Sequence, residues 1–236
     1  MLVCEHASSA VPPHLDSLGL ARADLERHIG WDIGALALAL ECSRRLDAPL
    51  VHATYSRLVL DVNRPVDAPD SIVDASEDTP IPGNANLPQF ERRHREREVY
   101  RPFHAALAAL VRERAARGHA TAVATIHSFT PVYRGVSRPW HIGVLSDRDR
   151  RLADALLRDF SAQPGLCVGD NEPYSPRDRV YHTLERHAQS AGLPCVMIEV
   201  RNDGIADPHG QGAWADRLCA ALRPALATVH GPVAAS

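Results

Sequence analysis

The stretch Cys195-Val-Met-Ile-Glu-Val200 is apolar at all but one position, which is typical of a strand buried in the centre of a sheet. Helical patterns lie on both sides of it, over residues 177–191 and residues 213–229. The first of these helices is expected to end at Gly192 and Pro194, because both residue types stop helices. A strand between two helices indicates an α/β fold, in which helices cover a largely parallel sheet.

The same alternation of strand and helix continues over the rest of the chain. Strands are predicted at residues 2–4, 49–53, 58–62, 120–126 and 141–145, with a further short strand near Cys167. Helices are predicted at residues 24–46, 88–116 and 148–160. We find no internal repeat and no linker, so the sequence predicts one domain over residues 1–236. Its fold should have three layers, with a mostly parallel, mixed central sheet and helices on both faces.

One segment between the predicted elements stands out by its composition. Residues 67–86 are rich in Pro, Asp, Ser, Gly and Asn, so they are expected to form a surface loop. At about twenty residues this loop is longer than most connections, and loops of that length often serve as lids or binding loops.

Composition excludes several classes of protein. The chain has 236 residues, of which 45% are hydrophobic, enough for one sizeable core. A formal net charge of -3 gives no electrostatic reason to expect nucleic acid or an anionic membrane as a partner. No apolar run approaches the roughly 20 residues of a membrane span. The first residues lack the pattern of a signal peptide, so we expect a cytoplasmic protein that acts on a small molecule.

Cysteine and lysine usage narrows the chemistry further. The five cysteines are scattered and show no CxxC spacing, which argues against a disulfide framework and against a cysteine-type zinc site. The chain contains no lysine, which excludes a P-loop, a Schiff-base lysine and a pyridoxal phosphate site. An anionic substrate must therefore be held by arginine, whose planar guanidinium suits carboxylates.

Polar side chains gather where the predicted strands end. Glu5 and His6 follow the first strand, Asn63 and Arg64 follow residues 58–62, and His127 follows residues 120–126. Glu199 and Arg201 lie at the end of the strand quoted above. Because ligand sites of such sheets lie beyond the carboxyl ends of the strands, these residues are expected to share one rim.

Two histidines and one carboxylate form a zinc-binding set that leaves a fourth position open for water. Bound zinc lowers the pKa of that water to about 7, and a nearby carboxylate can accept its proton. If His6 and His127 bind one ion, their nitrogens must lie within about 5 Å of each other. The sequence thus indicates a hydrolase that uses zinc, or another divalent metal, at neutral pH.

Four segments together resemble the N-formylglutamate amidohydrolase family, and the resemblance runs over nearly the whole chain. They are Cys4-Glu5-His6-Ala7-Ser8, Tyr55-Ser56-Arg57, His127-Ser128-Phe129-Thr130-Pro131 and Ile198-Glu199-Val200-Arg201-Asn202-Asp203. The resemblance implies a zinc-dependent amidohydrolase that cleaves the amide of an N-formyl or other N-acyl acidic amino acid, such as N-formyl-L-glutamate. It also suggests that the polar turn at residues 169–174 borders the site.

Three segments also resemble zinc carboxypeptidases, which implies a carboxypeptidase-like fold. Ile126-His127-Ser128-Phe129 resembles the strand that ends in a metal ligand of those enzymes. Asp61-Val62-Asn63-Arg64 resembles the segment whose Asn and Arg bind the substrate carboxylate. Ile198–Asp203 resembles the strand that carries their general base, which implies this role for Glu199.

The identity of the carboxylate ligand stays open at the level of sequence. In the carboxypeptidase pattern an acid follows the first histidine by three residues, but here His6 is followed by Ala7-Ser8-Ser9. Glu5 is adjacent to His6, although alternation along a strand would point it to the opposite face. Asp32 is the other candidate, because it would share a helix face with His28 four residues earlier.

The remaining candidates are substrate contacts. Arg57 and Arg64 could clamp the two carboxylates of a glutamate-like substrate, although Arg57 could equally form an ion pair at the sheet edge. His187, in the helix that leads to the Glu199 strand, is either near the metal or substrate, or an ordinary helix histidine. Arg201 is placed at the same rim by its position at a strand end.

Two other functions fit the same residues. A metallopeptidase or a deacylase of other N-acyl amino acids would use the same metal site with a different pocket. A non-catalytic binding protein could keep the fold, but it would have no need of both Glu199 and a full ligand set. The oligomeric state is not encoded in any pattern of this sequence.

Overall fold

The computed structural model describes residues 1–230 and is built around a six-stranded sheet with the order β2-β1-β5-β10-β8-β9. The four strands on one side run parallel to one another. β8 is antiparallel to β10, and β9 is parallel to β8. The strands are β1 (Leu2–Cys4), β2 (Leu50–His52), β5 (Val123–Phe129), β8 (Ile142–Leu145), β9 (Val168–Asp170) and β10 (Cys195–Arg201). The predicted mixed, mostly parallel sheet is confirmed.

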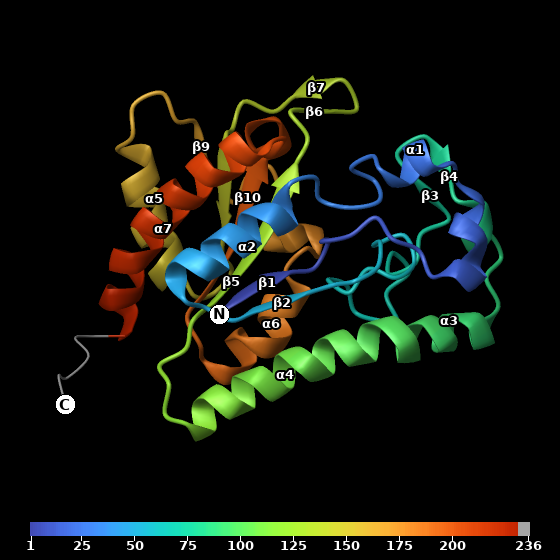
Figure 1. The fold of residues 1–236 in the computed structure, drawn as a ribbon, viewed down its shortest axis with the longest axis horizontal. Helices are drawn as coiled ribbons and strands as arrows, with labels where there is room; N and C mark the ends of the chain where they lie inside the picture. Colours follow the sequence, from blue (N-terminus) through green and yellow to red (C-terminus); the bar gives the residue numbers. More distant parts are fainter. Residues whose placement is uncertain (231–236) are drawn as a thin grey trace.

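Helices cover both faces of this sheet. α2 (Ala35–Leu46), α5 (Arg151–Ser161) and α7 (Pro208–His230) contribute to one apolar core with the sheet. α4 (Arg101–Ala116) and α6 (His182–His187) contribute to a second core on the other side. Figure 1 shows α4 and α6 on one side of the strands and α2 and α7 on the other. The expected three layers are therefore present.

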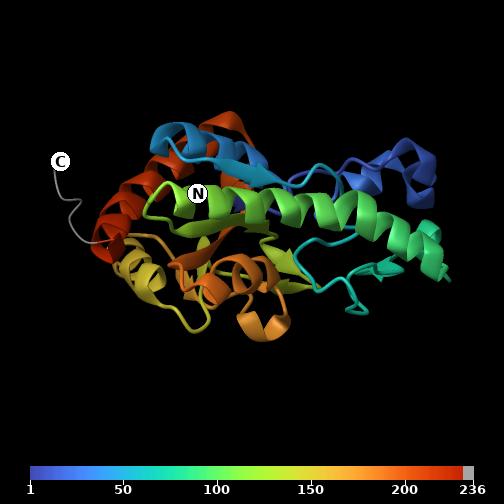
Figure 2. The same ribbon diagram turned by 90° about the horizontal axis from the view of Figure 1, so that it is seen from below.

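The predicted helix 88–116 forms one long rod. It consists of α3 (Gln89–Arg95), a π turn over Glu96–Tyr100, and α4. Figure 2 shows the rod running from the sheet to a lobe that contains α1 and the hairpin of β3 and β4. The smaller elements are α1 (Arg22–Leu25), β3 (Ala75–Ser76), β4 (Thr79–Pro80), β6 (Val132–Tyr133) and β7 (Val136–Ser137). Short 3₁₀ turns cover Pro13–Gly19, Pro82–Asn84, Pro176–Asp178, Gln189–Ala191 and Asn202–Ile205.

The prediction of one helix over residues 24–46 is wrong, and the break has a function in the fold. Only α1 and α2 are helical, and the chain between them turns at Gly30 and Gly34. Gly34 has φ +80°, a left-handed conformation that favours glycine, and it precedes α2 directly. The turn lets the backbone N–H of Asp32 donate to the carbonyl of His6 at 2.8 Å. Asp32 is thereby held beside the end of β1 instead of on a helix face.

The prediction of a strand at residues 58–62 is also wrong. This apolar segment is buried but makes turns, and the Val59 N–H donates to the Ser56 carbonyl at 3.0 Å. The buried guanidinium of Arg95 donates to the Val59 carbonyl at 3.0 Å and to Asn84 Oδ1 at 2.7 Å. Since a short apolar run looks the same whether it is a strand or another buried segment, periodicity alone could not separate the two.

Two further expectations can be compared with the structure. The predicted loop over residues 67–86 is largely irregular but contains the β3–β4 hairpin and the turn Pro82–Asn84. Within residues 1–230, no helix is long and apolar enough to cross a membrane. The predicted single domain extends over residues 231–236 as well, which lie outside the described part of the chain.

Candidate metal centre and active site

The candidate site lies at the carboxyl ends of three central strands. Glu5 and His6 follow β1 directly, whereas His127 and Glu199 lie within β5 and β10 and face each other in the register of that parallel pair. β5 thus extends past the predicted end at residue 126, so that His127 sits on a strand and not in a loop. All four side chains are buried, so packing restricts their positions.

Two of these side chains, His6 and His127, converge with buried Asp32 on one point. Asp32 Oδ2 lies 2.8 Å from His127 Nδ1 and 3.5 Å from His6 Nδ1. One potential ligand atom from each of His6, Asp32 and His127 lies within 4.8 Å of the others. The distance between the two histidines is therefore within the limit of about 5 Å set by a shared ion. These three residues form a buried group that could hold a metal.

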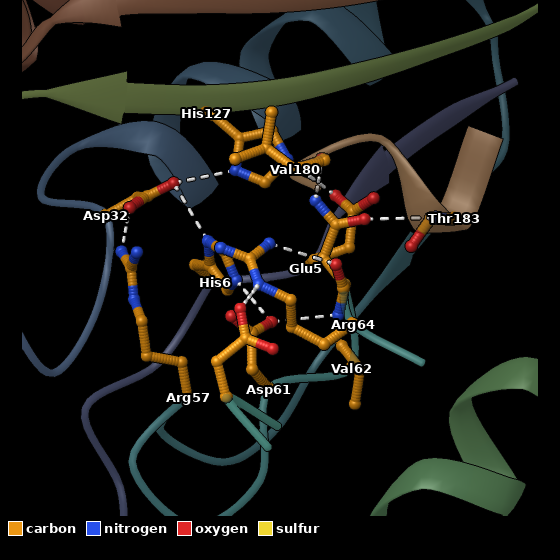
Figure 3. A network of polar contacts seen from close by, with 12 residues as sticks. Glu5, His6, Asp32, Arg57, Asp61, Val62, Arg64, His127, Val180 and Thr183 are labelled. Atoms are coloured by element: carbon orange, nitrogen blue, oxygen red, sulfur yellow. Dashed lines mark hydrogen bonds and ion pairs between the residues drawn. The ribbon is translucent and has the colours of Figure 1, made fainter. Parts of the chain in front are cut away.

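Each histidine of this group has a second carboxylate on its outer side. His6 Nε2 lies 2.8 Å from Asp61 Oδ1, and His127 Nε2 lies 3.0 Å from Glu5 Oε2. Figure 3 shows His6 between Asp32 and Asp61, and Glu5 away from Asp32. Carboxylates in this outer position fix the orientation and tautomer of metal-binding histidines, so that the inner nitrogen points to the ion. Glu5 is thus placed behind a histidine, whereas Asp32 lies at the point of convergence.

The charges around this group fit a bound cation. Glu5, Asp32, Asp61 and Glu199 are four carboxylates within a largely buried cluster. Burial alone would lower the pKa of His127, but the neighbouring Glu5 and Asp32 reverse this and hold it well above its usual value. The centre therefore attracts positive charge. Two imidazoles and a carboxylate are a donor set that suits zinc.

Glu199 is placed beside the three converging residues without joining them. Its Oε2 is buried and has no hydrogen-bond partner among residues 1–230. Burial raises the pKa of Glu199 to about 7, although the nearby His127 opposes this rise. A buried carboxylate with a free oxygen and a pKa near neutrality is suited to accept and return a proton.

The three residues open into a pocket of about 270 Å³, and two arginines line it. Arg57 forms an ion pair with Asp32 Oδ1, the oxygen that faces away from the histidines. Arg64 donates from Nε to Asp70 at 3.2 Å and from Nη1 to the Arg179 carbonyl at 3.0 Å. The ion pair considered for Arg57 is present, but its partner belongs to the centre of the site.

Three predicted substrate contacts have other partners in the structure. Asn63 lines the pocket, yet its amide accepts from the Thr183 N–H at 3.0 Å and donates to the Val180 carbonyl. Arg201 binds Asp203 at 2.8 Å, and neither Arg201 nor His187 lines the pocket. His187 lies behind the pocket wall, and its Nε2 is hydrogen-bonded to Nδ1 of His104 at 2.8 Å.

Two tyrosines that were not predicted as site residues also line the pocket. They are Tyr133, from the β6–β7 hairpin, and Tyr174, from the polar turn expected to border the site. Arg138 connects them, since its guanidinium lies 4.6 Å from the Tyr133 ring and 4.8 Å from the Tyr174 ring. Its Nη1 also donates to Tyr174 Oη at 3.0 Å. The family resemblance indicated the turn that contains Tyr174 but no particular side chain, and no sequence signal indicated Tyr133.

Most of the chain matches a known family model. Residues 1–206 match the model of the N-formylglutamate amidohydrolase family. The chain belongs to this family. The resemblance found in the sequence is thereby confirmed, and membership supports a hydrolase that acts on amide bonds.

Two solved structures share the fold of this chain. The gene product Atu2144 from Agrobacterium tumefaciens is 45% identical, with a TM-score of 0.95 over 98% of this chain and 91% of that one. An N-formylglutamate amidohydrolase from Ralstonia eutropha JMP134 is 20% identical, with a TM-score of 0.63 over 98% of this chain and 94% of that one. The second likeness, at this identity, shows a shared fold. A comparison with curated proteins found no match.

Proposed function

We propose that this member of the family is a zinc-dependent amidohydrolase that cleaves N-formyl-L-glutamate or a closely related N-acyl acidic amino acid. One observation carries the proposal: His6, His127 and Asp32 direct a ligand atom each to one buried point beside Glu199. In this reading Asp32, and not Glu5, is the carboxylate ligand, because Glu5 lies against the outer nitrogen of His127. Glu5 and Asp61 then orient the two histidines.

The chain's own residues supply the remaining chemistry. When bound, zinc would acidify a water molecule and polarise the amide carbonyl. Glu199 accepts the proton of the attacking water and then delivers it to the leaving nitrogen of the amino acid. This role requires a carboxylate that is held near the reacting atoms and free of other partners, as Glu199 is at Oε2.

Arginines of the pocket hold the acidic substrate. Arg64 and Arg57 present their guanidinium groups to the same pocket, and no lysine competes for this role. Arg57 is already paired with Asp32, so we assign the main carboxylate contact to Arg64. The amide of Asn63 is engaged by α6 and the preceding turn, and its part is to hold the Arg64 segment.

A substrate screen with and without metal tests this function. The zinc-loaded protein should hydrolyse N-formyl-L-glutamate with a higher kcat/KM than N-acetyl-L-glutamate, N-formyl-L-leucine or a glutamyl dipeptide. Treatment with a chelator should abolish turnover, and added zinc should restore it, because the metal supplies the nucleophile. Preference for the dipeptide would support a metallopeptidase instead, and preference for the acetyl compound a different deacylase. Full activity after complete metal removal would refute the zinc mechanism.

The role of Arg64 can be tested by removing its charge. Arg64→Ala should raise KM for N-formyl-L-glutamate about tenfold to hundredfold, since a hydrogen bond to a charged group contributes about 1.5–3 kcal/mol. N-formyl-L-glutamine and N-formyl-L-isoglutamine each lack one carboxylate, so the analogue that lacks the partner of Arg64 should be least affected.

A matched control for this substitution is available on the surface. Arg148 is exposed and, among residues 1–230, forms an ion pair only with its neighbour Asp147, so Arg148→Ala changes the net charge equally without reaching the pocket. Steady-state kinetics of both variants should separate a local contact from a general charge effect. Equal KM values for Arg64→Ala and the wild type would contradict the assignment.

A further inference from the structure

Two buried histidines lie behind the pocket and outside it. His104 belongs to α4 and His187 to α6, and their ring planes are nearly parallel, at 16°, with centroids 5.1 Å apart. His187 Nε2 lies 2.8 Å from His104 Nδ1, and His104 Nε2 lies 3.0 Å from the carbonyl oxygen of Val62. The hydrolytic chemistry uses neither ring directly, yet this chain of hydrogen bonds ends on the segment that carries Arg64.

The carbonyl of Val62 determines which group donates in each of these two hydrogen bonds. A carbonyl can only accept, so His104 must carry its proton on Nε2. His104 Nδ1 is then the acceptor, and His187 Nε2 must donate to it. Burial lowers the pKa of His104 to about 3 and that of His187 to about 4, so both rings are neutral at physiological pH, as this arrangement needs.

One peptide unit connects these histidines to the candidate metal centre. The carbonyl of Val62 and the N–H of Asn63 belong to the same planar peptide group. That N–H donates to Asp61 Oδ1 at 2.8 Å, and the same oxygen lies 2.8 Å from His6 Nε2. The outer carboxylate of His6 is therefore held by a peptide that His104 holds from the other end. Figure 3 shows the Asp61 end of this connection.

We propose that His104 is a positioning residue that acts through the Val62–Asn63 peptide unit on Asp61, with its tautomer held by His187, and so keeps Nδ1 of His6 directed at the metal. The inference rests on the metal centre of the proposed function. The Asn63 side chain is hydrogen-bonded to Thr183 of α6 and to Val180 just before α6. These bonds restrain the same peptide unit a second time. A rotation of this plane would withdraw the N–H from Asp61 and loosen the orientation of His6.

Substitutions of His104 can remove the two bonds of this chain separately. A glutamine amide nitrogen takes the place of Nε2, so His104→Gln keeps the donor to Val62. An asparagine side chain is shorter and reaches the place of Nδ1, so His104→Asn keeps contact with His187 and loses Val62. His104→Phe loses both bonds but fills a similar volume. Leu107→Val is the matched control. Leu107 is fully buried one turn further along α4, and it takes no part in the hydrogen bonds that connect His187, His104 and Val62.

Zinc affinity, measured by competition with a chelating dye, is the main readout. Loss of residues in this outer position typically weakens metal binding 10–100-fold, and for the more remote His104 we expect about tenfold for both His104→Phe and His104→Asn. His104→Gln should bind zinc as the wild type does, and so should Leu107→Val. Wild-type affinity in folded His104→Asn would overturn the proposal. A loss in Leu107→Val as large as in His104→Asn would overturn it too, because a general loss of packing would then explain both.

A second readout needs no metal. Nitrogen-15 spectra of the metal-free protein should show His6, His104 and His187 protonated at Nε2, and His104→Asn should change the His6 signal while His104→Gln leaves it unchanged. If His104→Phe fails to fold, the comparison of His104→Asn with His104→Gln tests the proposal without it. His187→Gln and His187→Asn provide the same comparison at the second histidine. Wild-type protein that binds no zinc would refute the proposed function, whereas an unchanged His6 signal in His104→Asn would refute this inference alone.

Discussion

Replacing Glu199 with glutamine should lower kcat for N-formyl-L-glutamate by a factor of about 10²–10⁴, the usual contribution of general acid–base catalysis. The amide keeps the size of the carboxylate but cannot accept a proton from water. KM should change little, because Glu199 is not assigned to bind the substrate carboxylate. Bound zinc, measured by elemental analysis, should stay at the wild-type level, since Glu199 lies beside the ligand group and not in it.

A control on the same strand end separates catalysis from structure. Asp203 follows β10, is half-exposed at its side chain and pairs with Arg201, so Asp203→Asn removes an acid from the same region without entering the pocket. Near-normal turnover of Glu199→Gln would disprove the general-base role. Loss of activity together with loss of zinc or of folding would instead assign Glu199 to the structure of the strand end.

The strand ends could be predicted because they obey a rule of topology. Buried parallel strands are continuous apolar runs, and polar residues that follow them must meet at one edge of the sheet. This sufficed to bring His6, His127 and Glu199 together in the prediction, even though His127 lies inside its strand and not after it. An error of three residues at the end of β5 does not move His127 away from the rim.

Asp32 could be named as a candidate but could not be placed correctly from the sequence. The helical spacing of apolar residues around it concealed a turn, and the turn depends on a tertiary hydrogen bond from Asp32 N–H to the His6 carbonyl. Such a bond has no local signature. The i, i+4 relation to His28 survives only as a contact of 3.8 Å outside any helix.

The sequence did not reveal the partners of the predicted substrate contacts, because these side chains have more than one possible partner. An arginine or an asparagine at a strand end is consistent with both substrate binding and internal bonds. Asn63 is used by Thr183 and Val180, and Arg201 by Asp203, because those groups fold against them from distant parts of the chain or from the next turn. Spacing alone carries no information on such partners.

Replacing His127 with alanine should abolish zinc binding at micromolar metal and lower kcat/KM about 10³-fold or more. The metal contributes several kcal/mol of charge stabilisation in the transition state, and each 1.36 kcal/mol is a factor of ten in rate. Stability gives an independent readout. Wild-type protein should gain about 2.7 kcal/mol in unfolding free energy at a zinc concentration 100 times the Kd, and the variant should gain none.

Thr125, two residues before His127 on β5, provides the control for this substitution. Its side chain is buried, and its hydroxyl has no hydrogen-bond partner among residues 1–230. Thr125→Val should therefore fold and bind zinc like the wild type, because it removes no bond and keeps the volume. His127→Ala also leaves Glu5 and Asp32 without their shared partner, so it should be less stable even in the absence of metal. Zinc-dependent stabilisation of His127→Ala equal to that of Thr125→Val would rule out the proposed metal centre.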